Sequence, residues 1–316
     1  MKQFLCWLSH CNEQVVSALD KSHSFGFVDV ALLTMVVIWG VNFTVVKTAL
    51  HEMTPMAFNA LRFAGASVLT LFLAWLIEHD LAIPRRDWGL VLLLSVIGNL
   101  VYQILFINGL ARTRASNTSL ILSTSPIFVA LVSTITKAEK LSSRNWAGIL
   151  LSFLGIFLLI TGSNNGVAID NQTLQGNLLV LCATISWATY TVFLKRLLQR
   201  HSVLKATAWI MAATTPLLIL VALPDFLTQD WHAVSYGSWL GLFYSSVLAI
   251  GIGYVIWNTG VQRVGSVRTA VYSYFTPVIS VMVAWIFLGE NMHALQALGA
   301  VGIFLGVWLG RSRPTE

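Results

Sequence analysis

The feature that most constrains the fold is a succession of apolar runs that extends from Val28 to the C-terminus. A helix that crosses a bilayer needs roughly 20 predominantly apolar residues, and these runs are of that length. Only 10% of the 316 residues are charged, whereas a soluble domain has about 25%. The short alternating segments of a transmembrane barrel do not occur in the sequence. The sequence therefore predicts an all-α, polytopic membrane protein.

Proline, glycine and clusters of charge divide the apolar runs into ten candidate transmembrane helices. The predicted ranges are 28–48, 55–77, 88–111, 116–137, 145–162, 176–195, 203–222, 238–260, 268–288 and 292–310. Lys and Arg are retained on the cytoplasmic side of a membrane. With the N-terminus inside, all but four of the 19 Lys and Arg residues lie in cytoplasmic segments. Both termini are therefore predicted to be cytoplasmic.

The segments outside the predicted spans show no sign of secretion or of nucleic-acid binding. Residues 1–27 are predicted to be a cytoplasmic N-terminal segment and 311–316 a cytoplasmic tail, because the first apolar stretch is too short for a signal peptide. Cys6, Cys11 and Cys182 are expected to be free thiols. The net charge of +6 comes from scattered residues and not from one basic element, so no nucleic-acid partner is expected.

The second half of the chain repeats the first half. The segment "GLARTRASNTSLILSTSPIFVALVSTITKAE" (109–139) aligns without a gap on "GVQRVGSVRTAVYSYFTPVISVMVAWIFLGE" (260–290). Likewise "WGVNFTVVK" (39–47) recurs as "WATYTVFLK" (187–195). Such a run of matches predicts two repeats, 28–162 and 176–310. Each has an odd number of helices, so the halves are inverted, as is typical of secondary transporters that work by alternating access.

On these motifs the chain resembles the EamA-type group of the drug/metabolite transporter superfamily, over about residues 29–311. The matching stretches are "IWGVNFTVVKTAL", "TPMAFNALRF", "LSTSPIFVAL", "ISWATYTVFLKR" and "YFTPVISVMVAWIFLGE". The resemblance implies a ten-helix carrier with a central cavity that exports or exchanges small metabolites, often amino acids or related compounds. Arg62 matches the family's Arg in the second helix, whereas the corresponding place in the second half, near Ile210, has no basic residue.

Polar and aromatic side chains within the spans are the candidate site, because a polar group that faces lipid loses its hydrogen bonds. The predicted substrate-binding residues are Trp39, Asn42, Asn99, Tyr102, Gln103, Trp187, Tyr190, Tyr254, Trp257 and Asn258. The alternative for the amides is that they only join neighbouring helices. The cavity is expected to be aromatic and polar but nearly neutral at its centre.

Two basic residues near the outer face have a separate interpretation. Lys47 and Arg62 are predicted to steer substrates that carry a carboxylate toward the outer mouth of the cavity. The alternative for Arg62 is that its long side chain reaches back to the periplasmic interface and serves only to anchor the helix.

Several signatures are missing from the sequence. No Asp, Glu or His lies at mid-span, and the Walker, HExxH, CxxC and GxSxG motifs do not occur. We therefore expect no cofactor, no metal and no enzymatic activity. The leading hypothesis is an uncoupled secondary exporter or exchanger of small organic metabolites in a bacterial inner membrane, monomeric or homodimeric. The alternatives are a proton-coupled multidrug or metabolite efflux carrier that uses Asp29, Glu139 or Glu290, a channel or sensor, and an intramembrane enzyme.

Overall fold

The computed structural model describes residues 26–113, 115–139, 141–161, 171–279 and 294–310. Within these ranges all regular structure is helical, and six helices are long and apolar enough to cross a membrane. They span Phe27–Ala49, Pro55–Glu78, Arg85–Arg112, Leu174–Leu198, Val203–Thr228 and Tyr236–Val264. The all-α, multi-pass architecture is confirmed. The count of ten remains a prediction, because shorter helices occupy the other predicted places and part of the ninth range lies outside the described residues.

The helices follow one another with short connections. In chain order they are α3 (Phe27–Ala49), α4 (Pro55–Glu78), η1 (Arg85–Asp87), α5 (Trp88–Leu94), η2 (Ser95–Val101), α6 (Tyr102–Arg112), α7 (Ala115–Leu122), α8 (Ser125–Ile135), α9 (Ser143–Thr161), α10 (Asn171–Leu198), α11 (Val203–Thr228), α12 (Tyr236–Tyr244), η3 (Ser245–Ile252), α13 (Gly253–Val264), α14 (Ser266–Val271), η4 (Tyr272–Tyr274) and α16 (Ala294–Gly310). Residues 1–25 of the predicted N-terminal segment 1–27, with Cys6 and Cys11, lie outside the described residues. The predicted tail 311–316 and Glu290 also lie outside them.

Three of the spans depart from a regular α-helix. The spans 85–112 and 236–264 each contain a π-helical segment, η2 and η3, at corresponding places. π-Helical turns displace the backbone hydrogen bonds and often occur at functional sites. The predicted span 116–137 is broken between α7 and α8, where Pro126 has no N–H to donate. By contrast, α11 continues through Pro216 and Pro224, beyond its predicted end at residue 222.

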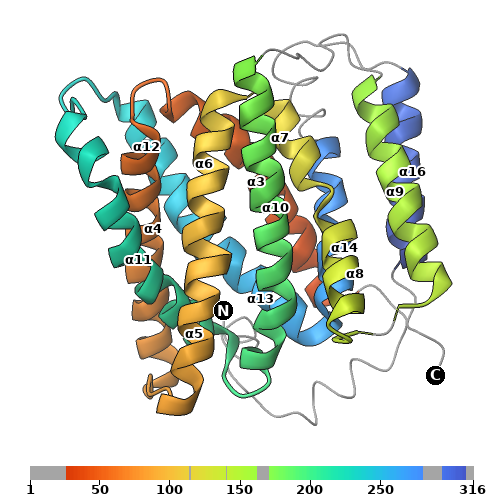
Figure 1. The fold of residues 1–316 in the computed structure, drawn as a ribbon, viewed down its shortest axis with the longest axis horizontal. Helices are drawn as coiled ribbons and strands as arrows, with labels where there is room; N and C mark the ends of the chain where they lie inside the picture. The colour runs from red at the N-terminus through yellow and green to blue at the C-terminus, as the bar shows by residue number, and fades with distance from the viewer. Residues whose placement is uncertain (1–25, 114, 140, 162–170, 280–293, 311–316) are drawn as a thin grey trace.

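Helices that occupy corresponding places in the two halves of the sequence pack against each other. The pairs α4 with α11 and α9 with α16 form the two flanks of the molecule in Figure 1. Between the flanks, α6 packs on α10 and α3 packs on α13. The pair α9 and α16 is so close that a Cβ at Gly155 would lie 2.6 Å from the carbonyl oxygen of Gly299. Gly155 therefore allows the close packing of these two helices.

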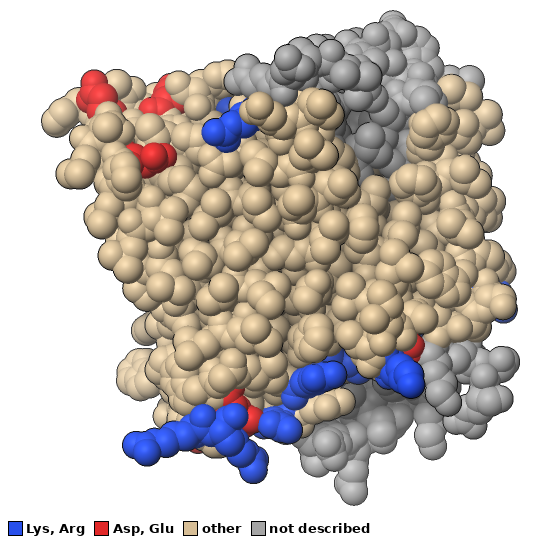
Figure 2. Space-filling view, in the orientation of Figure 1, with Lys and Arg blue, Asp and Glu red and all other residues tan. Residues whose placement is uncertain are grey.

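The charges lie at the two ends of the helix bundle. Figure 2 shows most of the visible Lys and Arg at the end where α5 lies, with some Asp and Glu among them, further acidic and basic residues at the opposite end, and a broad uncharged band between the two ends. At the basic end, Arg200 after α10 donates to Asp87 in η1 at 2.6 Å, and His201 lies 2.9 Å from the same carboxylate. The uncharged band is the surface that can face lipid tails, because charged groups there would lose their hydration.

Candidate functional site

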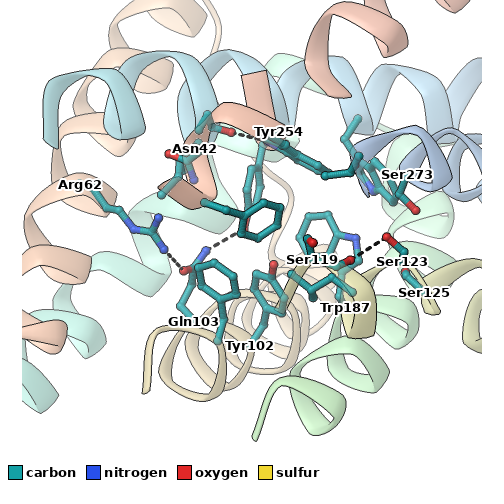
Figure 3. A pocket seen from close by; sticks show the side chains of 18 residues that line it. Asn42, Arg62, Tyr102, Gln103, Ser119, Ser123, Ser125, Trp187, Tyr254 and Ser273 are labelled. Atoms are coloured by element: carbon teal, nitrogen blue, oxygen red, sulfur yellow. Dashed lines mark hydrogen bonds between the residues drawn. The ribbon is translucent and has the colours of Figure 1, made fainter. Parts of the chain in front are cut away.

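A cavity of about 80 Å³ lies in the middle of the bundle, between the two halves of the chain. Its walls come from the first-half helices α3, α4, α6, α7 and α8 with the turn between the last two, and from the second-half elements α10, η3, α13 and η4 with the helical residues 275–279 that follow it. The lining residues are Trp39, Asn42, Phe43, Arg62, Tyr102, Gln103, Phe106, Ser119, Leu122, Ser123, Ser125, Trp187, Ala249, Ile250, Tyr254, Trp257, Ser273 and Thr276. Side chains from both halves therefore line the same cavity (Figure 3).

Aromatic rings from three helices form the central part of the wall. The ring centroid of Trp187 on α10 lies 6.0 Å from that of Trp39 on α3, and 5.1 and 5.3 Å from those of Tyr254 and Trp257 on α13. Edge-on and tilted contacts at such distances are favourable for aromatic side chains. On the first-half side, Tyr102 lies 5.0 Å from Trp187. The result is a continuous aromatic surface with a few polar groups along it.

Arg62 on α4 forms one end of the cavity. Its side chain is only 2% exposed. Its Nε donates to Asn59 Oδ1 at 2.9 Å, its Nη1 to Ser245 Oγ at 3.1 Å and its Nη2 to Gln103 Oε1 at 2.8 Å. The guanidinium also faces the ring of Phe106, 5.5 Å from its centroid. The interpretation that Arg62 reaches to the membrane interface is wrong, since its hydrogen bonds hold it inside the bundle.

The buried arginine also changes the predicted charge of the cavity. No salt bridge to Arg62 is found among the described residues, and no carboxylate is part of the cavity lining. Neutral oxygen atoms and aromatic faces surround the guanidinium instead. The expectation of a nearly neutral centre therefore holds for the aromatic part of the wall but not for the Arg62 end.

Lys47 does not line the cavity. Its Nζ donates to the carbonyl oxygens of Leu110 at 2.8 Å, Ala111 at 3.2 Å and Thr113 at 2.8 Å. The last carbonyls of a helix have no partners within the helix, and a positive charge there also complements the helix dipole. The structure thus gives Lys47 a capping role at the end of α6, in place of the predicted substrate-steering role.

The predicted substrate-binding residues divide into two groups. Those that line the cavity are Trp39, Asn42, Tyr102, Gln103, Trp187, Tyr254 and Trp257. Asn99, Tyr190 and Asn258 are buried but lie outside it. The Tyr190 ring packs against Gly98, and its hydroxyl donates to Asn258 Oδ1 at 3.3 Å. The Asn258 amide in turn donates to Thr207 Oγ1 at 2.8 Å, so both side chains join helices, as the alternative interpretation holds.

A group of hydroxyl side chains at the other end of the cavity was not predicted. Figure 3 shows Ser119, Ser123, Ser125 and Ser273 away from Arg62, across the aromatic wall. They lie in "SLILSTSP", before Pro126, and in "YSYFTP", before Pro277. A cluster of Ser and Thr directly before a proline in an apolar span could have indicated them, because a broken helix needs nearby partners for its freed backbone groups.

The acidic residues considered for proton transfer do not line the cavity. Asp29 lies at the start of α3, where it accepts a hydrogen bond from the Tyr272 hydroxyl. Glu139 follows α8, and its Oε1 accepts from Lys195 Nζ at 3.0 Å and from the backbone N–H of Ser266 at 2.7 Å. Among the described residues, no group of His, Cys, Asp and Glu could hold a metal ion.

The comparisons with known proteins agree with this architecture. The model of the EamA-like transporter family matches residues 26–161 and 174–310. A "Probable amino-acid metabolite efflux pump" of Salmonella typhimurium is 30% identical over 88% of this chain and 92% of its own length. The Escherichia coli protein of the same name is 29% identical over 89% and 93%. A solved crystal structure superposes with a TM-score of 0.75 at 19% identity, over 90% of this chain and 96% of its own, which supports the fold. The chain belongs to the EamA-like transporter family.

Proposed function

We propose that this transporter is a secondary carrier that exports or exchanges small organic metabolites, such as amino acids or related compounds, by alternating access. The observation that carries the proposal is the cavity whose wall is shared by the two halves of the chain. A site between two corresponding halves can open to one side of the membrane or to the other when the halves move against each other. The names of the two bacterial efflux relatives point to the same class of substrate.

The size of the cavity supports a mechanism in which the halves must part. Sites that hold small molecules usually have volumes of about 300–1,000 Å³, whereas this cavity has about 80 Å³. Trp39 Nε1 joins the halves by its hydrogen bond to the Ala249 carbonyl oxygen in η3, at 2.8 Å. The π-helical segments and the break before Pro126 are places where the helices next to the cavity can bend. We infer that substrate enters when these contacts loosen on one side.

The same proposal places the basic end of the bundle in the cytoplasm of a bacterial cell. Lys and Arg are retained on the cytoplasmic side of the membrane, and they gather at the end where α5 lies (Figure 2). In this orientation both termini are cytoplasmic and the connection between α11 and α12 faces the periplasm. Export then runs from the basic end of the molecule to the opposite end.

Counterflow in proteoliposomes tests whether the protein is a carrier. Vesicles that contain the purified protein are loaded with one unlabelled amino acid at a time and diluted into the same compound with a radioactive label. A carrier accumulates label transiently, because the inward step is coupled to the exit of unlabelled substrate. A channel only equilibrates the label, and a sensor or an enzyme moves none. Absence of transient accumulation for the whole panel of amino acids and related metabolites would refute the proposal.

A further inference from the structure

The Arg62 end of the cavity has the features of a site for an anionic group. The guanidinium is buried, and its three hydrogen bonds go to uncharged oxygen atoms of Asn59, Ser245 and Gln103. A guanidinium has more N–H groups than these bonds use. A buried charge without an opposite charge is costly, so such groups are usually paired. The described residues supply no counterion, and Arg62 faces the cavity, where a bound ligand can supply one.

Two neighbours can complete the binding of a carboxylate. Gln103 Oε1 accepts from Arg62, and its Nε2 donates to the Tyr254 hydroxyl oxygen at 2.8 Å. The hydroxyl proton of Tyr254 has no acceptor among the described residues, and Tyr254 belongs to the cavity lining. On one side of the cavity, Arg62 therefore offers N–H donors and Tyr254 offers an O–H donor. The Gln103 amide between them holds both side chains in place.

Asn42 offers a hydrogen-bond acceptor in the same cavity. Its side chain is more than nine-tenths buried, and its Oδ1 has no hydrogen-bond partner among the described residues. An unpartnered carbonyl oxygen in a buried place costs stability unless a donor reaches it. Figure 3 shows Asn42 toward the same end of the cavity as Arg62, with the aromatic wall beyond both. A ligand whose carboxylate binds Arg62 can therefore place a hydrogen-bond donor near Asn42 Oδ1.

We propose that the cavity recognises the zwitterionic head of an α-amino acid, an inference that rests on the proposed transport function. The carboxylate binds Arg62 and the Tyr254 hydroxyl, and the ammonium donates to Asn42 Oδ1. The substrate side chain then lies along Trp39, Trp187 and Trp257 toward the serine end, where Ser125 Oγ also has no partner in the part of the chain that the structure describes. This assignment explains why Arg62 has no counterpart in the second half: the substrate has one carboxylate, and one cation suffices to bind it.

Analogues that lack one charged group test the assignment on the unmodified protein. Each of the twenty proteinogenic L-amino acids is added to the purified protein in nanodiscs, and the rise in Tm gives its affinity. The best amino acid is then compared with its decarboxylated amine and its deaminated acid. We expect each analogue to bind about tenfold to hundredfold more weakly, since each loses one charge-assisted hydrogen bond. Binding of either analogue as tight as that of the amino acid, or of no amino acid at all, would overturn the proposal.

Variants then assign the two groups of the ligand. Arg62→Gln should abolish the preference for the amino acid over its amine, and Asn42→Leu should abolish the preference over the deaminated acid. The matched control is Asn99→Leu, because Asn99 also has a buried carboxamide without partners but lies outside the cavity. It should leave both preferences unchanged. If Arg62→Gln does not fold, the analogue series on the wild-type protein still decides. Unchanged preferences in Asn42→Leu would overturn the role of that residue.

The two proposals can fail separately. Binding of zwitterions without counterflow would refute the carrier function but leave the recognition site. Counterflow of compounds that have no carboxylate, at rates equal to those of amino acids, would leave the carrier function but refute the site.

Discussion

Trp39 connects the two halves of the protein at the cavity. Its indole N–H donates to the carbonyl oxygen of Ala249 at 2.8 Å, and its ring contacts Trp187 and Trp257. Ala249 belongs to the π-helical segment η3, in which backbone carbonyls are displaced from the regular α-helical pattern. The Trp39 side chain thus lines the cavity and also forms a hydrogen bond that joins α3 to η3.

We predict that Trp39→Phe lowers both stability and transport. The ring contacts largely remain, but the hydrogen bond is lost, which should lower the free energy of unfolding by about 0.5–1.5 kcal/mol. Because this bond lies at the cavity between the halves, counterflow should also slow several-fold. The control is Trp209→Phe, whose N–H donates to the Leu81 carbonyl oxygen at 2.7 Å away from the cavity. It should show a similar change in Tm with normal counterflow. Equal transport by both variants would contradict the prediction.

Helical spacing alone predicted only part of the cavity lining. Tyr102 and Gln103 line the cavity, whereas Asn99, three residues before Tyr102, lies outside it. Lys47 and Arg62 could not be separated in this way, since both are basic residues in apolar helices. What distinguishes them is the neighbour that each meets, which is the end of α6 for Lys47 and the amides of Asn59 and Gln103 for Arg62.

Glu139 joins elements of the two halves at one end of the bundle. It follows the first-half helix α8, and it contacts two second-half elements, through Lys195 of α10 and the first N–H groups of α14. Glu139 Oε1 also lies near Gly265, whose φ of 91° is unfavourable for side chains with a Cβ. The carboxylate therefore holds the start of α14 in its position relative to both α8 and α10.

We predict that Glu139→Gln loosens the start of α14 without unfolding the protein. The amide oxygen can still accept, but a hydrogen bond to an uncharged acceptor is weaker by about 1 kcal/mol. Hydrogen–deuterium exchange of a peptide that covers residues 264–272 should accelerate about fivefold. Glu78→Gln is the control, because Glu78 accepts from the Ser202 hydroxyl and does not contact α14. Unchanged exchange in Glu139→Gln would show that the carboxylate does not stabilise this helix start.

At the level of elements, long apolar helices were predictable and their irregularities were only partly so. The break before Pro126 follows from the chemistry of proline, which has no N–H to donate. The π-helical segments have no such local cause. Ser95 Oγ in η2 donates to the Ile210 carbonyl oxygen at 3.0 Å, and Ser245 Oγ in η3 accepts from Arg62. These partners come from α11 and α4, and a contact between distant parts of the chain is not visible in local spacing.

For the whole molecule, the gathering of Lys and Arg at one end in Figure 2 leads to a prediction about orientation. Single cysteines are introduced at the exposed positions 232 and 199 of a variant without the native cysteines, in intact cells. A membrane-impermeant maleimide should label position 232, between α11 and α12, and should reach position 199, after α10, only when the membrane is permeabilised. The reverse pattern would contradict the assignment of cytoplasmic termini and reverse the direction of export.

The last prediction concerns energy coupling, which also belongs to the whole molecule. A proton-coupled carrier needs a group that gains and loses a proton between its two open states, and this is commonly an intramembrane carboxylate or imidazole. None of the described residues that line the cavity is of this kind. We therefore expect movement of substrate down its own gradient. In proteoliposomes with the membrane potential clamped, a pH gradient should drive no accumulation of substrate. The Asp29→Asn variant should keep its counterflow, because Asp29 contacts Tyr272 at the start of α3 and does not line the cavity. Uphill accumulation that is lost in Asp29→Asn would instead identify Asp29 as the proton carrier, with Tyr272 as its partner in the protonation step.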